Sequence, residues 1–118
     1  LGAMAGMAWS ANLALPADLK PSVWACSKLP CQSDDIDDEL FGELESSNWI
    51  LVVEDHVKCG GLGQQLASDF LERKPQIKNY SHKYVKGYIS GLYGSQDFHR
   101  KENGLDLETI LDFIKQMQ

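Results

Sequence analysis

The clearest hydrophobic pattern in the chain is the apolar run at residues 49–53, which no polar residue interrupts. Such a run is typical of a parallel strand that is covered on both faces. Three ionisable residues follow it at once: Glu54, Asp55 and His56. Three glycines then allow a tight turn and a close backbone approach: Gly60, Gly61 and Gly63. Because residues 62–73 have helical periodicity, the stretch predicts a strand, a charged turn, a glycine loop and a helix.

Similar patterns predict the remaining elements. Four further helices are expected, at residues 3–15, from Asp34 or Asp35 as cap to about residue 46, at 96–102, and after Asp106 as cap with an apolar face over residues 107–114. Two short apolar runs predict strands, at residues 22–27 and 84–89. Alternation of strands and helices favours right-handed crossovers and a mostly parallel sheet. The predicted fold class is therefore α/β, with three layers, helices on both faces of the sheet and a Rossmann-like topology.

The length of 118 residues corresponds to one domain that spans residues 1–118. The chain opens directly on a helix, and Leu1 and Gly2 look like the tail of a strand. A doubly wound unit normally has a strand before its first helix, so we expect the first strand to be truncated. The chain is then expected to be a fragment or a split subunit, with an incomplete sheet edge that invites pairing.

Charge and composition narrow the function classes. The formal net charge is −6, which argues against nucleic acid and anionic membranes as partners. No apolar run approaches ~20 residues, and the N-terminus lacks the pattern of a signal peptide. The three cysteines are an odd number, which favours reduced thiols in a cytoplasmic protein, with Cys26 buried in a strand.

The glycine loop has neither the dinucleotide-binding pattern nor a Walker sequence. Its amides at a helix start are able to hold an anion, although a packing role for the glycines is the favoured interpretation. Adjacent residues of an extended chain point in different directions, so Glu54, Asp55 and His56 do not form an acid–base pair by sequence alone. We expect them at a contact with another domain or subunit. The sequence predicts no catalytic, cofactor-binding or metal-binding residue.

Three blocks resemble the C-terminal domain of transketolase, the third domain of thiamine-diphosphate-dependent ketol transferases. The first is Val-Val-Glu-Asp-His at residues 52–56 with Gly-Gly-Leu-Gly at residues 60–63. The others are Gly-Leu-Tyr-Gly-Ser-Gln-Asp-Phe at residues 91–98 and Gly-Leu-Asp-Leu-Glu-Thr-Ile at residues 104–110. Their order and spacing match over about half of the chain. Deoxyxylulose-phosphate synthase and the β-subunit of 2-oxo acid dehydrogenases carry a similar domain, so the family member stays open.

The resemblance implies a non-catalytic domain that supports the dimer and its neighbouring domains. In that family, the other domains bind thiamine diphosphate and Mg and transfer a two-carbon ketol unit between sugar phosphates. No cofactor is therefore expected on this chain, and its expected partners are the other domains or subunit of a homodimeric enzyme. A free-standing module that binds a phosphorylated metabolite at the loop of Gly60 and Gly63 is the alternative.

Overall fold

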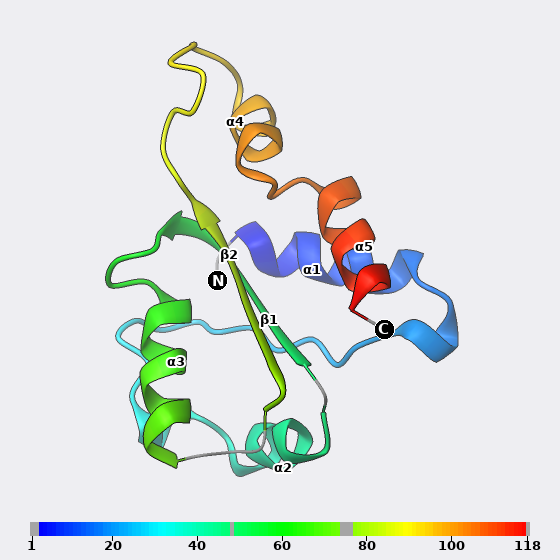
Figure 1. Cartoon of the computed structure of the whole chain (residues 1–118), viewed down its shortest axis with the longest axis vertical. Helices are drawn as coiled ribbons and strands as arrows, with labels where there is room; N and C mark the ends of the chain where they lie inside the picture. Colours follow the sequence, from blue (N-terminus) through cyan, green and yellow to red (C-terminus); the bar gives the residue numbers. More distant parts are fainter. Residues whose placement is uncertain (1–2, 48, 74–76, 118) are drawn as a thin grey trace.

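The computed structural model describes residues 3–47, 49–73 and 77–117 of the chain. The described α-helices are α1 (Ala3–Ala14), α2 (Asp38–Ser46), α3 (Leu62–Arg73), α4 (Gln96–Asn103) and α5 (Leu107–Gln116). Short 3-10 turns occur at Ala17–Leu19 and Ser33–Asp35. The described strands are β1 (Trp49–Val57) and β2 (Asn79–Val85), and Figure 1 shows them at the centre of the molecule.

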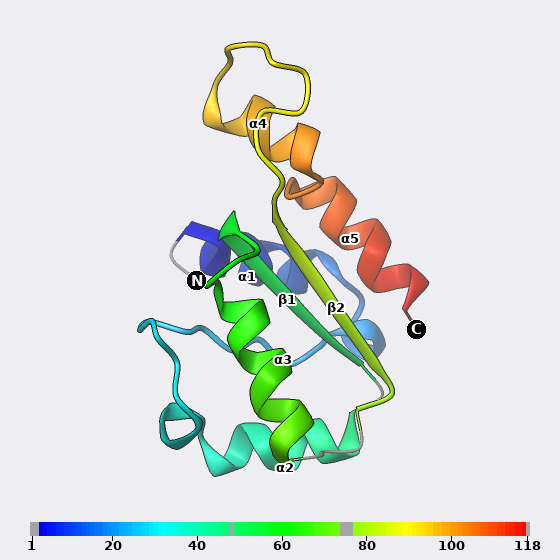
Figure 2. The ribbon, with the colours of Figure 1, turned by 60° about the vertical axis from the view of Figure 1, so that its left-hand side comes forward.

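The two strands form a parallel sheet in which Ile50 pairs with Tyr80 and Val52 pairs with His82. Side chains alternate between the two faces of a strand, so each face of β1 has its own core. One core joins β1 to α1 and α5, and its buried members are Met4, Ala11, Leu15, Leu105, Ile110 and Ile114. The other joins β1 to α2 and α3, and its buried members are Ile36, Leu44, Val52, Leu62, Leu66 and Phe70. The chain is thus an α/β domain with helices against both faces of a parallel sheet (Figure 2).

Side-chain caps define several helix ends. Asp37, Ser95 and Asp106 accept hydrogen bonds from backbone amides at the starts of α2, α4 and α5. The pKa of Asp106 lies below its ordinary value: burial raises it, but hydrogen bonds from Thr109 lower it more. Gly104 ends α4 in the left-handed region, with φ of 69°, which a side chain rarely adopts. This turn places α5 directly after α4.

The helices were predicted better than the strands. Helices α1, α3, α4 and α5 confirm their predictions to within one residue at most ends. The predicted helix at residues 34–46 begins later, at Asp38, with Asp37 as its cap in place of Asp34 or Asp35. Those two acidic residues belong instead to the short turn Ser33–Asp35. The predicted strand remnant at Leu1 and Gly2 lies outside the described residues.

Three strand predictions need correction. Residues 22–27 are not in a strand, because they pair with no neighbour, and Cys26 there is half-buried. The strand predicted at residues 84–89 is Asn79–Val85, since the segment with alternating aromatic side chains pairs with β1. The expected charged turn at residues 54–56 is the end of β1, which continues to Val57. A register shift between Val53 and Val57 accommodates this extension.

We predict that Leu105→Ala destabilises the fold severely. Leu105 has no exposed surface and lies in the core between α1, α5 and β1. Removal of a buried Leu side chain costs about 2–5 kcal/mol through lost transfer energy and the cavity that remains. Urea unfolding followed by circular dichroism measures the loss. The control is Leu71→Ala on α3, where the side chain is 77% exposed and truncation should change the unfolding free energy little. Equal effects of the two variants would contradict the assignment of the core.

Candidate functional site

The site predicted from the sequence is centred on a buried carboxylate. Glu54 near the end of β1 is 0% exposed, so its charge needs partners inside the protein. Its two oxygens accept hydrogen bonds from the Leu62 amide at 2.7 Å and the Gly63 amide at 3.2 Å. These amides belong to the first turn of α3, where the free N–H groups and the helix dipole favour a negative group. Glu54 therefore caps α3 from the neighbouring strand.

His82 on β2 supplies the third partner. Its Nε2 lies 2.5 Å from a Glu54 oxygen, and its side chain is almost fully enclosed. The parallel register brings the two together, because His82 pairs with Val52 and Glu54 follows Val52 on the same face of β1. The centre thus joins β1, β2 and the start of α3.

Tyr80 extends this centre along β2. Its hydroxyl donates a hydrogen bond to the Gly63 carbonyl oxygen. Burial and the nearby Glu54 carboxylate raise the pKa of Tyr80 from 10.0 to about 12, because both oppose a phenolate. The hydroxyl is therefore a stable donor at neutral pH and holds the carbonyl group of Gly63, whose amide donates to Glu54.

The glycines of the loop are sites of close approach. A Cβ atom at Gly61 would lie 2.5 Å from a Glu54 oxygen, and one at Gly63 would lie 2.4 Å from the His82 ring. A glycine is favoured at position 60 for a different reason, because its backbone has a φ of 74°, in the left-handed region. The distances at Gly61 and Gly63 agree with the packing role that the sequence predicted for these glycines.

Every amide of the loop has an acceptor within the chain. The Gly60 amide donates to the Gln64 side chain at 2.8 Å, and the Gly61 amide donates to the Lys58 carbonyl oxygen at 3.3 Å. Leu62 and Gly63 donate to Glu54, as described above. A phosphate at this helix start would have to displace the protein's own carboxylate.

Asp55 and His56 point elsewhere. Asp55 accepts hydrogen bonds from Arg100 at 3.0 Å and from Gln96 at 3.3 Å, both on α4. His56 is exposed, and its Nδ1 lies 2.8 Å from the Val57 carbonyl oxygen. The three adjacent ionisable residues are therefore divided among α3, α4 and the surface, and they do not form a common acid–base group.

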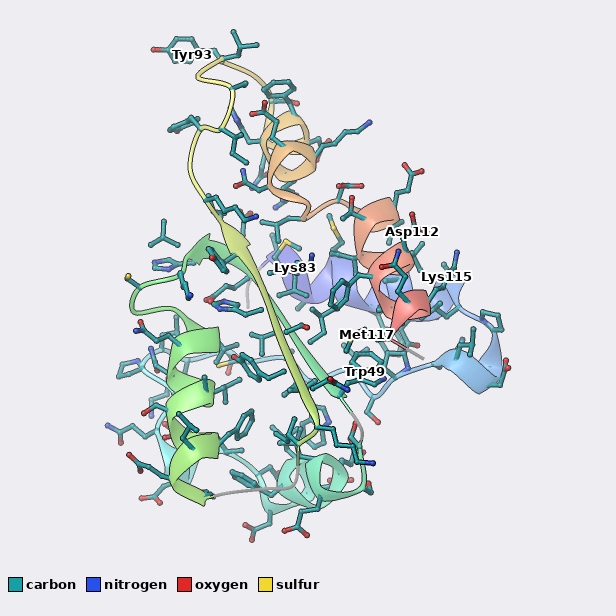
Figure 3. All side chains as sticks on the ribbon, viewed as in Figure 1. Trp49, Lys83, Tyr93, Asp112, Lys115 and Met117 are labelled. Atoms are coloured by element: carbon teal, nitrogen blue, oxygen red, sulfur yellow. The ribbon has the colours of Figure 1, made fainter. Side chains whose placement is uncertain are left out.

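Beyond these residues, the carboxyl end of the sheet carries an exposed loop. Residues 86–95 leave β2 and extend from the body of the domain, with Tyr93 at the tip (Figures 1 and 3). We call residues 88–93 the apolar arm, because four of them are exposed and largely apolar: Tyr88, Ile89, Leu92 and Tyr93. Tyr93 is 102% exposed. These four side chains together give the arm an exposed, largely apolar surface.

The base of the apolar arm is fixed by Asn103 on α4, which is buried. Its side-chain oxygen accepts from the Lys86 amide at 2.7 Å, and its amide group donates to the carbonyl oxygens of Gly87 and His99. A cavity of about 450 Å³ lies beside this base, and Asp55, Arg100 and Tyr88 are among the residues that line it. These hydrogen bonds join residues 86 and 87, at the base of the arm, to α4.

The buried centre lies apart from the two cavities described for this chain. Neither Glu54 nor His82 is among the residues that line that cavity or the larger groove beside β1. In the described ranges, no group of three or more His, Cys, Asp or Glu side chains is placed to hold a metal ion. None of the described helices combines the length and apolar character needed to cross a bilayer.

Comparisons with known proteins add no relative. No protein-family model matches the chain, and the searches of curated proteins and of solved structures give no significant match. The resemblance to transketolase therefore stays a hypothesis that rests on the sequence blocks alone.

The sequence did not indicate that His82 and Tyr80 belong to the site. Both lie in a segment with polar residues between its aromatic rings, and that segment was not predicted as a strand. The usable signal was the alternation of Tyr80, His82 and Tyr84, which places three rings on one face of a strand. A parallel pairing of that strand with β1 would then have brought His82 to Glu54.

We predict opposite effects for two Gly→Ala substitutions. Gly63→Ala should destabilise the domain by about 1–3 kcal/mol, because its Cβ would overlap the His82 ring. Gly42→Ala should stabilise it by about 0.5–1 kcal/mol, because Gly42 is exposed within α2 and its Cβ would contact nothing within 4 Å. Chemical unfolding of both variants measures the two changes, and a neutral Gly63→Ala would show that the His82 contact is not tight.

A pH dependence follows from Tyr80. The folded chain keeps the Tyr80 proton up to about pH 12, whereas the unfolded chain releases it near 10.0, so this group's contribution to stability is complete below pH 10 and is lost between these values. Tyr80→Phe has no such contribution. The difference in unfolding free energy between the native chain and Tyr80→Phe should therefore shrink as the pH rises from 10 to about 12. A difference that stays constant over this range would contradict the raised pKa.

Proposed function

We propose that the chain is a non-catalytic, assembly-supporting domain of a transketolase-type enzyme, with its contact surface at the carboxyl end of the sheet. The observation that carries this proposal is that the candidate residues are divided between the interior and the surface of the domain. Glu54 has its partners inside the fold, whereas His56 near the end of β1 and the apolar arm that follows β2 are exposed, both at the carboxyl end of the sheet. Ligands and partners of open α/β sheets dock at this end.

Two further features support a role in contacts. The arm presents two Tyr rings, and Tyr is enriched among the residues that dominate protein–protein binding. Its base is held by Asn103, so binding has little backbone entropy to lose there. A partner with an apolar pocket bordered by polar groups fits this surface, such as a neighbouring domain or the second subunit of a homodimer.

We also propose a fold more specific than an α/β domain. A three-layer, Rossmann-like sheet of the transketolase C-terminal type would contain β1 and β2 as neighbouring parallel strands with helices on both faces. In such an enzyme, thiamine diphosphate and Mg would be bound by the other domains, and this chain would hold them in place. A related thiamine enzyme would use the domain in the same way.

The alternative module that binds a phosphorylated metabolite has less support. Its site would be the loop of Gly60 and Gly63, where all backbone amides already have acceptors in the chain. Replacement of Glu54 by a phosphate would leave a buried carboxylate without its partners, which is costly. The acidic net charge of −6 also opposes anion binding.

The test has two parts. The purified chain alone should show no ketol transfer between xylulose 5-phosphate and ribose 5-phosphate in the presence of thiamine diphosphate and Mg²⁺, and turnover above the buffer blank would overturn the non-catalytic role. The chain should bind the two thiamine-binding domains of a transketolase that lacks its third domain. We expect Tyr93→Ala to weaken this binding about tenfold, because a buried Tyr anchor is worth at least ~1.4 kcal/mol, and His56→Ala to weaken it in the same direction.

Leu71→Ala is the matched control, because it also removes an exposed apolar side chain but lies on α3, far from the arm. It should leave the dissociation constant unchanged, and none of the three variants should change the unfolding midpoint much. Equal binding by Tyr93→Ala and the native chain would place the contact surface elsewhere. Saturable binding of ribose 5-phosphate by the chain alone would favour the metabolite-binding alternative.

A further inference from the structure

A groove of about 910 Å³ runs along one side of β1. Residues 49–53 of β1 form one wall, and residues 20–28 form the other. This second segment is not helical and pairs with no strand, and Figure 2 shows it in light blue behind the sheet. The groove therefore separates β1 from a second chain segment that passes close to it.

The groove lies at the level of the sheet, between the two helical layers. Its lining includes Met4 and Ile114 from the core of α1 and α5. It also includes Leu44 and Leu66 from the core of α2 and α3. A space that reaches both cores, with β1 at its side, has the position of a strand in a sheet covered on both faces.

The groove has room for an extended segment of chain. Neighbouring strands lie about 4.8 Å apart, packed layers lie about 10 Å apart, and six residues of a strand extend for about 20 Å, which together occupy roughly 950 Å³. The groove is partly open to solvent, and its volume of about 910 Å³ is of the same order. A small cofactor would fill part of it and leave the polar groups of the walls without partners.

The backbone of β1 supplies the hydrogen-bonding edge. β1 pairs with β2 on one edge, and in the described ranges no backbone hydrogen bond joins its other edge to residues 20–28. A two-stranded sheet is marginal on its own, and unpaired strand edges bind additional strands. An occupant that satisfies this edge must be an extended polypeptide, with apolar residues for both cores.

The direction and the source of the strand follow from α1. Figure 1 shows the N-terminal end of α1 near the end of β1 at which the strand finishes, and α1 packs against the face of β1. A strand parallel to β1 in the groove would finish at this same end, so a short connection would lead from it into α1. We propose that the groove receives one largely apolar strand, parallel to β1, supplied by a polypeptide segment that leads directly into α1. This inference does not depend on the proposed enzyme family.

The experiment adds such a strand to the full chain. The probe is the heptapeptide Thr-Val-Val-Ile-Val-Ala-Thr fused through Gly-Ser before Leu1. We expect NMR hydrogen exchange of the amides of residues 49–53 to slow at least about tenfold, because paired strand amides are protected. The matched control fusion has Pro at the central position, which lacks an N–H group and disrupts pairing, and should give no protection. If the Pro fusion protected the amides of residues 49–53 as strongly as the heptapeptide fusion does, the strand model would be overturned.

Two groove variants locate the fused segment. Ala25→Asp on the exposed wall, and Ala8→Asp on α1, should each remove most of the protection, because they place a charge against the apolar strand. Ser10→Asp is the matched control on α1, since Ser10 is exposed and does not line the groove. Ala25 is exposed, so its variant stays informative if Ala8→Asp fails to fold.

The outcomes separate the sources of the strand. Absence of protection in a folded fusion overturns the proposal. Protection by the free heptapeptide, without protection in the fusion, overturns the connection to α1 and assigns the groove to a separate partner chain. Protection in the fusion that Ala25→Asp removes and Ser10→Asp leaves supports the proposal. Failure of the enzyme-assembly test would leave this result unchanged, so the two proposals can be judged separately.

Discussion

The burial of one carboxylate is the constraint on which much of this domain depends. Glu54 has no contact with solvent, so its charge is stabilised by two amides of α3 and by His82. Loss of such partners leaves a desolvated charge, at a cost of about 3–5 kcal/mol. The same contacts fix the start of α3 relative to both strands. The position of one side chain thus determines how a helix and a two-stranded sheet are joined.

The helices could be predicted because their signals are local. Apolar residues three and four apart, a capping residue such as Asp106 and a terminal glycine such as Gly104 all lie within the segment that they define. The strands needed information from elsewhere in the chain. Residues 22–27 have an apolar pattern but no neighbour with which to pair. β2 is interrupted by a polar residue, His82, because that residue is one member of the buried acid–histidine pair. Tertiary context decides such segments, and the pattern alone does not.

The candidate site also has features that the sequence predicted and features that it did not. The sequence predicted that Glu54, Asp55 and His56 would point in different directions, and the structure confirms it. The partners that explain Glu54 and Asp55 were not predicted, because His82 and Arg100 lie 28 and 45 residues away along the chain. Only the pairing of β1 with β2 and the position of α4 bring these side chains together. A list of ionisable residues therefore indicates where chemistry is concentrated, but not which groups share it.

The close contacts at Gly61 and Gly63 have a consequence for how this sequence can vary over time. A larger residue at position 63 needs the space that the His82 ring now occupies, and a larger residue at position 61 needs the space of the Glu54 carboxylate. Substitutions at positions 54, 61, 63 and 82 are therefore coupled, since each is tolerated only when its neighbour has already changed. In a lineage of related chains, these four positions should drift as a group, separately from the apolar residues of the two cores.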